Sequence, residues 1–360
     1  GLPLLIQTPH ALVTVVGTEF DLNVAMNQTE LDVTHGLVKI TDTSEAHPVS
    51  VAAGEFAVTS PHAPLRYGRL ARHPFHWPFS STSVWNRALG SDAQFSPIPG
   101  PPLLEDGALQ HALRPRRPFV GSATDPLRRI WVGGEVCGDI RLSDANLPKA
   151  GLGDSLVLLQ QARRYALELR GVSVRSDGDL EAQAMSRTDL AGPGVENASS
   201  PAKPFRFSNL GGLLRTGEWE NGIRHALSAR VSRERLAGLA NTWPQTVWPA
   251  GDGTAATQTS LGVGSLLALP PSVDIRALFG ASGPAYELAR AMQDYGLYVT
   301  GPIDAPFVLL TDDTRFPGAD DLITRLVPLL QVVVSNAPDS PAGGGSPRRE
   351  PAPAFPGEAE

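Results

Sequence analysis

Cysteine is almost missing from this sequence. Cys137 is the only one in 360 residues, so the chain can form no internal disulfide, no C-x-x-C pair and no zinc site built on several thiolates. The apolar run at 130–132 just before it predicts that Cys137 is a small buried residue rather than a nucleophile. Lysine is also scarce, and arginine supplies most of the positive charge; the lysines are Lys39, Lys149 and Lys203.

Several functional signatures are missing as well. The sequence has no G-x-S-x-G, no P-loop, no G-x-G-x-x-G after a strand and no cluster of His and Asp, so neither a cofactor nor a metal is expected. The formal net charge of −7 argues against nucleic acid as a partner, because phosphate binding needs a basic face. Neither a signal peptide nor a membrane span is recognisable, yet the chain opens in strand-like sequence without Met. We therefore expect a removed upstream segment, which is where an export signal or a membrane anchor would lie.

Glycine and proline, by contrast, are abundant, with 36 and 33 residues spread along the whole chain. Because proline blocks helix interiors and central strand positions, this distribution favours many short strands joined by turns. A length of 360 residues favours two domains, and 41% hydrophobic residues are enough to build their cores. The predicted fold is mainly β: a small β-module, then a larger β-rich domain, sandwich-like or barrel-like, with about two helices.

The pattern divides the chain into four segments. Residues 1–61 alternate in short β-branched runs and predict the β-module, whereas residues 62–80, with several Pro and His, predict a linker. Residues 81–335 form the larger domain. In residues 336–360, Pro, Gly and charge dominate, which predicts a disordered tail.

Two helices are predicted within the larger domain. The first has Ser282 as its cap and keeps its apolar positions on one face until Gly296 ends it. The second covers residues 319–326 and stops before Pro328. Asp274, ahead of the first helix, is expected to be a turn or cap residue.

Three separate blocks near the N-terminus follow one another in a recognisable order. They read TPHA with VVGTEF, then LDVTHGLV, then VAAGEF, between residues 8 and 56. This pattern resembles the second half of the FecR-type periplasmic domain, whose members read roughly TPxAxVxVxGTxF, VxVxEGxVxV and VxAGE. The resemblance implies a periplasmic module of a membrane-anchored regulator that relays a surface signal to a sigma factor. It therefore implies a periplasmic or extracellular location and an envelope signalling partner.

The larger domain resembles a family of exported bacterial proteins with no assigned reaction. Six ordered blocks carry this resemblance, at residues 83–89, 211–218, 222–227, 247–250, 264–274 and 293–296. The family commonly has Asp-x-His before the central hairpin and Tyr-Glu inside it. This chain has Asp154-Ser155 and Leu167-Glu168 there, so the His is missing, and Asp154 remains as a candidate for substrate contact.

Arg215, Glu218 and His225 form the best candidate catalytic group. On an acidic polysaccharide, Arg215 would neutralise a uronate while His225 abstracts the adjacent proton in a β-elimination. On a neutral glycan, Glu168 and Glu218 would be the acid and base of a glycosidase. The structural alternative is that His225 bonds a nearby turn and that Glu218 pairs with Arg215 on the surface.

Other candidates are weighed in the same way. Glu168 alternates with Leu167 and Leu169, so it points away from their face, and a solvated strand face is the simpler interpretation. Tryptophans in Gly- and Pro-flanked sequence could stack on sugar rings, although Trp also commonly completes hydrophobic cores. The tryptophans considered as a glycan platform are Trp85, Trp219, Trp243 and Trp248.

The first functional hypothesis is therefore an extracytoplasmic FecR-like sensor or regulator fused to a carbohydrate-recognising domain. Its expected partners are a polysaccharide and an envelope signalling protein, with no nucleic acid. The second hypothesis is a secreted polysaccharide lyase or glycoside hydrolase. The third is a structural envelope protein in which neither domain has a ligand.

Overall fold

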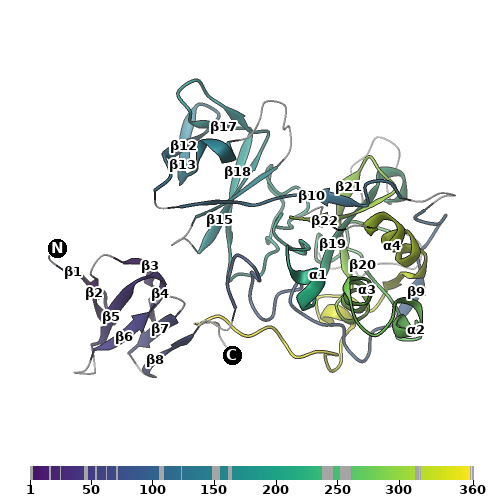
Figure 1. Ribbon diagram of the computed structural model, residues 1–360, viewed down its shortest axis with the longest axis horizontal. Coiled ribbons are helices and arrows are strands. Elements are labelled where there is room, and N and C mark those ends of the chain that lie inside the picture. Colours follow the sequence, from purple (N-terminus) through teal and green to yellow (C-terminus); the bar gives the residue numbers. More distant parts are fainter. Residues whose placement is uncertain are drawn as a thin grey trace.

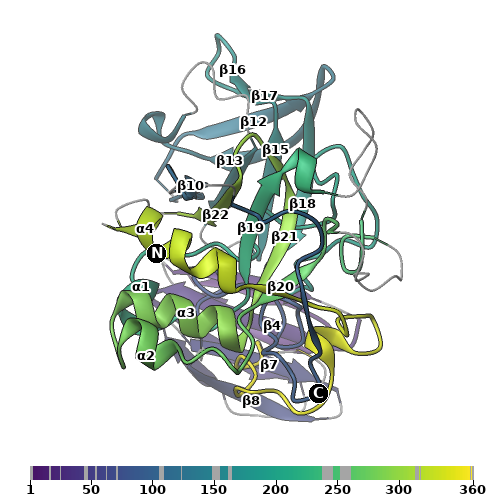
Figure 2. The same ribbon diagram turned by 90° about the vertical axis from the view of Figure 1, so that its right-hand side faces the viewer.

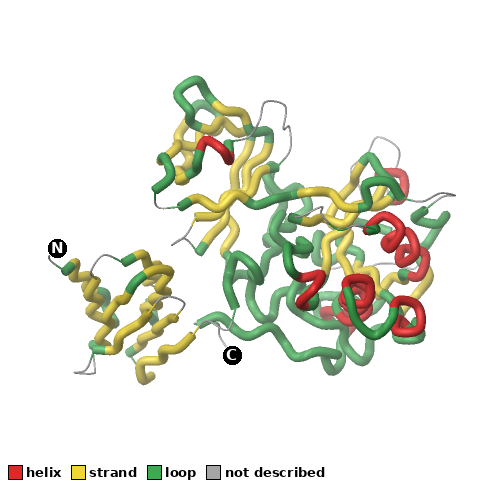
Figure 3. The backbone as a smooth tube through the Cα atoms, in the orientation of Figure 1, coloured by secondary structure: helices red, strands yellow, loops and turns green. Residues whose placement is uncertain are grey.

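The computed structural model shows a chain dominated by strands (Figures 1 and 3). About 39% of the residues lie in strands and 13% in helices, and the described strands form five sheets, which confirms the mainly-β prediction. The structure describes residues 3–15, 18–24, 26–43, 48–52, 55–61, 63–69, 72–104, 109–122, 124–147, 155–160, 164–236, 246–251, 261–312, 316, 318–356 and 358.

The N-terminal β-module consists of two antiparallel four-stranded sheets, drawn in purple in Figure 1. One sheet has the order β1-β2-β5-β6 and the other β3-β4-β7-β8. Alternate apolar residues such as Val13, Leu31 and Ile40 are fully buried in a core of their own. The strands are β1 (Leu4–Gln7), β2 (Ala11–Val15), β3 (Glu19–Val24), β4 (Thr29–His35), β5 (Leu37–Asp42), β6 (Val49–Ala52), β7 (Glu55–Ser60) and β8 (Ala63–Arg69).

The linker predicted over 62–80 is largely structured. Its first part is strand β8, which pairs antiparallel with β7, so the module extends to Arg69. Further on, Arg72 and Phe79 are buried. The proline content suggested a linker. Proline is nevertheless tolerated in β8, because this strand lies at a sheet edge and pairs with only one neighbouring strand.

Residues 119–189 form a second β-rich unit with a separate core. Its sheets have the orders β11-β14-β15-β18 and β13-β12-β17-β16. Ile130, Leu158 and Leu167 are among the residues of its core. The strands are β11 (Phe119–Gly121), β12 (Leu127–Val132), β13 (Glu135–Arg141), β14 (Leu156–Gln160), β15 (Tyr165–Arg170), β16 (Ser173–Val174), β17 (Leu180–Ala182) and β18 (Ala184–Asp189).

Cys137 is exposed on β13, so the prediction that it is buried is wrong. The strand is an edge strand, and all three of its first residues are exposed. The apolar run before it faces the core at Ile130, but the chain turns between β12 and β13. The Cys137 thiol therefore lies outside that core and is exposed to solvent.

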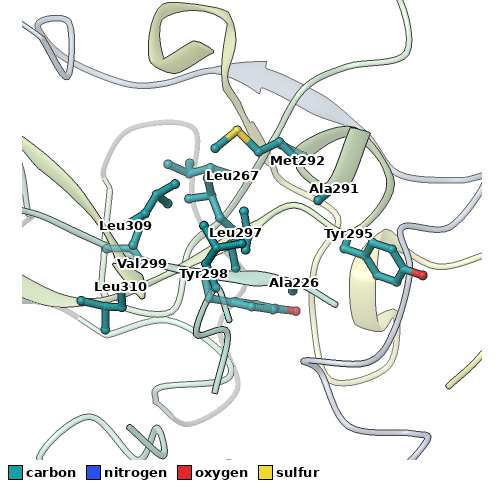
Figure 4. Close-up of a cluster of buried hydrophobic side chains, with 14 of the residues drawn as sticks. Ala226, Leu267, Ala291, Met292, Tyr295, Leu297, Tyr298, Val299, Leu309 and Leu310 are labelled. Atoms are coloured by element: carbon teal, nitrogen blue, oxygen red, sulfur yellow. The ribbon is translucent and has the colours of Figure 1, made fainter. Parts of the chain in front are cut away.

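The largest core surrounds a mixed seven-stranded sheet of order β10-β22-β19-β21-β20-β23-β9. Figure 4 shows part of this core, where Met292 of α3 lies over Leu267 and Leu297 of the sheet. The strands are β9 (Phe95–Pro97), β10 (Leu113–Pro115), β19 (Leu227–Ser232), β20 (Leu266–Ala268), β21 (Leu297–Ile303), β22 (Phe307–Thr311) and β23 (Gln331–Val333). The helices are α1 (Glu218–Asn221), α2 (Ile275–Phe279), α3 (Pro284–Asp294) and α4 (Ala319–Leu326).

Both predicted helices are present, as α3 and α4, and α4 has the predicted bounds. The cap of α3 is Gly283 rather than Ser282, and no side chain bonds to that helix end. Asp274 caps α2, accepting hydrogen bonds from the backbone N–H groups of Arg276 and Ala277. No helix in the described residues is both long and apolar enough to cross a membrane.

The C-terminal segment is ordered, contrary to the predicted disordered tail. It packs along residues 89–92, and Arg348 N–H donates to the Leu89 carbonyl at 2.9 Å. Near its end, the Arg72 guanidinium lies 3.8 Å from the centre of the Phe355 ring and pairs with Glu358. Figures 1 and 2 both show the segment, in yellow, ending beside β8. Composition suggested disorder because Pro and Gly form few local hydrogen bonds, yet distant parts of the chain satisfy the backbone here.

Trp85 connects several parts of the main core. Its indole is 1% exposed and lies 5.3 Å from the Phe207 ring and 5.5 Å from the Tyr298 ring, measured between centroids. Its N–H donates to the Gly194 carbonyl at 3.2 Å. The chain passes directly over the ring at Gly211 and Gly212, where a Cβ would lie 2.3 and 2.6 Å from indole carbons. Only glycine allows so close an approach.

We predict that Gly212→Ala destabilises the protein more than Gly133→Ala does. Both glycines have a similar positive φ, 66° and 61°, so alanine costs about 1–2 kcal/mol of backbone strain at either position. Only at Gly212 does the new methyl group also collide with Trp85 and with the backbone of β19, which adds about 1–3 kcal/mol. Urea unfolding of both variants measures the difference, and equal losses would contradict this account of the contact.

Candidate functional site

Arg215, Glu218 and His225 come together, as their proposed role requires. Arg215 follows a segment that bridges to β22, Glu218 begins α1, and His225 precedes β19. The backbone N–H of Arg215 donates to Glu218 Oε2 at 2.7 Å, which holds the carboxylate at the start of the helix. The three side chains thus occupy one corner beside the seven-stranded sheet.

The histidine lies between the other two charged groups. His225 Nε2 is 2.9 Å from Glu218 Oε1 and 3.4 Å from an Arg215 guanidinium nitrogen, and its Nδ1 is 2.9 Å from the Ala226 carbonyl. The Arg215 guanidinium donates to the carbonyls of Leu213 and Leu210, both at 2.9 Å. Backbone groups therefore account for much of the hydrogen bonding of this cluster.

The cluster is largely removed from solvent. The side chains of His225 and Glu218 are 3% and 18% exposed, and Arg215 is buried. Burial raises the pKa of Glu218, but the neighbouring His225 and Arg215 outweigh burial and hold that pKa below its usual value. Burial lowers the pKa of Arg215, against the opposing effect of Glu218 and Asp312. The predicted surface bridge is therefore a buried charge network.

Glu168 belongs to a different network, so the structure does not bring the proposed Glu168–Glu218 pair together. Its side chain points away from Leu167 and Leu169, as the alternation predicted, but it is fully buried rather than solvated. The Lys203 ammonium, also fully buried, lies 3.5 Å from Glu168 Oε1. The residues that donate hydrogen bonds to the Glu168 carboxylate are Thr188, Ser208 and Asn209.

Two of the four tryptophans considered as a glycan platform, Trp85 and Trp219, are buried. Trp85 is buried in the main core, and Trp219 is 5% exposed and stacked on Phe316 with 4.0 Å between ring centroids. Neither ring has a face open for a sugar to stack on. Trp248 is half-buried. Trp243 and Asp154 lie outside the described residues.

A cleft of about 290 Å³ opens above the Glu168–Lys203 network, and sequence reasoning missed it. It lies between the end of β15 and the polar face of β19 and β21. Its lining residues include Arg116, Arg170, Lys203, Asn209, Arg230 and Arg233. The signal in the sequence was weak, because these residues are scattered from 116 to 233 and only the fold brings them together.

Two broader hollows, of about 1040 and 890 Å³, share four lining residues: Gln110, Ile303, Asp304 and Ala305. The lining of the larger one includes Leu104 and Leu109, which flank residues outside the described part of the chain. Within the described residues, no group of three or more His, Cys, Asp or Glu side chains is placed to hold a metal ion.

Comparison with solved structures gives partial matches. No family model matches the chain, and no curated protein matches it. Two crystal structures of a candidate anti-sigma factor from Parabacteroides distasonis align with 19% of this chain, at 17% and 16% identity and TM-scores of 0.18 and 0.17. The alignments cover 33% and 32% of those chains, so this chain spans about a third of their length.

We predict that the Glu218 carboxylate stabilises the fold in a pH-dependent way. Because its pKa is lowered in the folded protein, its contribution is fully present above the unfolded pKa of about 4.3 and is lost as pH falls through the folded pKa. Glu218→Gln should therefore lower the free energy of unfolding by about 1–3 kcal/mol at neutral pH, and less in acid. Urea unfolding of both proteins across this range measures the difference.

Glu287→Gln is the matched control for this experiment. Its side chain is 19% exposed, close to the 18% of Glu218, but its nearest ionic partner, Arg290, is 3.9 Å away. Its loss should stay below about 1 kcal/mol. A loss in Glu218→Gln that is the same in acid and at neutral pH would show that the charge of Glu218 has no part in stability.

Proposed function

We propose that this chain is an extracytoplasmic regulatory protein in which a FecR-like module accompanies a carbohydrate-recognising domain. In this proposal the larger part of the chain binds its ligand without transforming it. The observation that carries it is the state of the cluster at Arg215, Glu218 and His225. The cluster is buried, and the side chains of Arg215 and His225 form hydrogen bonds with nearby backbone carbonyls. None of its three residues lines the cleft or the two broader hollows.

Burial of this kind is what a structural role requires. A general base must reach the substrate proton directly or through one water molecule. Nε2 of His225 instead contacts Glu218, and Nδ1 contacts the Ala226 carbonyl. The same bonds tie α1 to the start of β19, which makes the cluster a brace between a helix and the central sheet.

The cleft near Lys203 supports recognition of a sugar. Its volume of about 290 Å³ is at the small end of the range for ligand pockets, suited to one or two sugar rings. The lining contains the hydroxyl and amide groups of Ser208, Asn209 and Thr300, whose directions are fixed by bonds within the protein, and the aromatic ring of Phe205. Sugars need this combination, because their hydroxyl groups require hydrogen bonds while the C–H faces of their rings pack on aromatic side chains.

The regulatory part of the proposal rests on the FecR-like sequence blocks. The module that carries them has its own core. It contacts the rest of the chain where Arg164, just before β15, forms an ion pair with the buried Glu30 of β4. Arg72, which follows the module, holds the C-terminal segment. In the proposal, these two contacts transmit ligand binding in the larger part to the module, and the protein lies in the periplasm or outside the cell with an envelope signalling partner.

The direct test is a screen of the full chain against neutral and acidic polysaccharides. We expect binding, measured by affinity electrophoresis, with no new reducing ends and no rise in absorbance at the wavelength of unsaturated uronates. Glu218→Gln and His225→Asn should bind as the wild type does, provided that circular dichroism shows them folded.

Other outcomes decide between the remaining hypotheses. Product formation that disappears in both folded variants would overturn the proposal in favour of a lyase or glycosidase. If the protein neither binds nor degrades any polysaccharide in the panel, the hypothesis of a structural envelope protein is favoured. For the regulatory part, deletion of residues 1–69 from the gene should abolish the transcriptional response of the host to the bound polysaccharide, and an unchanged response would refute it.

A further inference from the structure

The cleft beside Lys203 has an unusual charge composition. Among the described residues, its lining contains five basic side chains and no carboxylate, although the whole chain has 37 acidic residues against 30 basic ones. The basic side chains are Arg116, Arg170, Lys203, Arg230 and Arg233, and they come from four stretches of the chain, because Arg230 and Arg233 lie on one stretch. A local surplus of this sign attracts an anion, because the low-dielectric walls of a cleft concentrate the field.

Carboxylate side chains neutralise the charge of the lysine, so the lysine does not add to that surplus of positive charge. Lys203 is fully buried, bonds Thr188 and Glu196, and lies 3.5 Å from Glu168. A buried ion of this kind needs a counter-ion, because desolvation is costly. Arg170 and Arg233 are exposed, so the positive charge that a ligand can reach is assigned to these two arginines.

The buried glutamate organises the floor of the cleft. Asn209 donates to Glu168 Oε2 through its backbone N–H at 2.8 Å and its side-chain amide at 2.7 Å. Both bonds fix the direction of the Asn209 amide, whose oxygen accepts a hydrogen bond from the Arg116 guanidinium at 2.6 Å. Arg116 is thereby held in position by a chain of bonds that begins at a fully buried carboxylate.

The wall of the cleft follows from strand alternation. Along β19, Ala229 and Val231 enter the main core, whereas Ser228 and Arg230 line the cleft. The Ser228 hydroxyl lies 2.8 Å from the hydroxyl of Thr300 on the neighbouring β21. A polar strip with fixed hydroxyl groups thus runs beside the arginines.

We propose that this cleft binds an anionic sugar residue of a polysaccharide, with its carboxylate held by Arg170 and Arg233 and its ring beside Phe205 and the Ser228–Thr300 hydroxyls. This inference deepens the proposed function and rests on it. Guanidinium groups suit a sugar carboxylate because their planar N–H donors match its two oxygens. The hydroxyl strip and the aromatic ring favour a sugar acid over a free inorganic anion, which would need neither.

The test is calorimetric titration of the full chain with three probes: trigalacturonate, the neutral galactose trisaccharide and inorganic phosphate. We expect trigalacturonate to bind, the neutral trisaccharide to bind at least about tenfold more weakly, and phosphate not to compete, because each charge-assisted hydrogen bond lost reduces affinity by about tenfold or more. Arg170→Ala and Arg233→Ala should each weaken trigalacturonate binding by about tenfold. Raising the salt concentration should also weaken it, since salt screens exposed charges.

Arg129→Ala is the matched control, because this substitution removes the same charge as Arg233→Ala. Arg129 is exposed on β12 and lies outside the cleft lining. Equal losses in Arg129→Ala and Arg233→Ala would reduce the effect to net charge and overturn the site. Equal binding of the acidic and neutral trisaccharides, or phosphate competing as strongly as trigalacturonate, would overturn the ligand assignment. A polysaccharide that binds with the same affinity to wild type and to both arginine variants would leave the recognition function standing and reject this cleft, whereas no glycan binding at all would reject the proposed function itself.

Discussion

The close packing of glycine backbone against Trp85 is the constraint on which the main core depends. The indole sits where the loop at Gly194, the segment at Gly211–Gly212 and the start of β19 meet, and Ala226 N–H donates to the Trp85 carbonyl at 2.7 Å. Residues 83–89, 211–218 and 222–227, which the sequence singled out as separate blocks, converge at this point. Their convergence has a packing explanation that requires no reaction.

Buried charge in this protein serves the architecture twice. Glu168 and Lys203 are both fully buried, and hydroxyl and amide groups complete the hydrogen bonding of the carboxylate. Arg215, Glu218 and His225 form the second network, in which backbone carbonyls accept hydrogen bonds from the Arg215 guanidinium. Such groups tolerate little displacement, because removing one partner leaves an uncompensated charge away from water. They hold the loop at 208–215 between the β-rich unit of residues 119–189 and the seven-stranded sheet.

The same buried carboxylate joins stability to the proposed binding site. Glu168 fixes Asn209, Asn209 holds Arg116, and the cleft opens directly above them. A residue that resembled a catalytic acid in the sequence is therefore better understood as the support of the proposed binding surface. The N-terminal β-module and the larger part of the chain are tied by Arg164–Glu30 and by the C-terminal segment at Arg72.

The sequence alone determined the local structure. Alternating β-branched runs predicted the strands of the N-terminal module, and the spacing of apolar residues predicted α3 and the bounds of α4, because these patterns depend only on neighbours along the chain. Proximity of residues 215, 218 and 225 was also predictable, since only ten positions separate them. Burial was not: Glu168, Trp85 and Cys137 each lie in strand-like or loop-like sequence that does not show what packs on the other side. The order of the C-terminal segment and the collection of arginines in one cleft were decided only by the tertiary structure, because both depend on contacts between residues far apart in the chain.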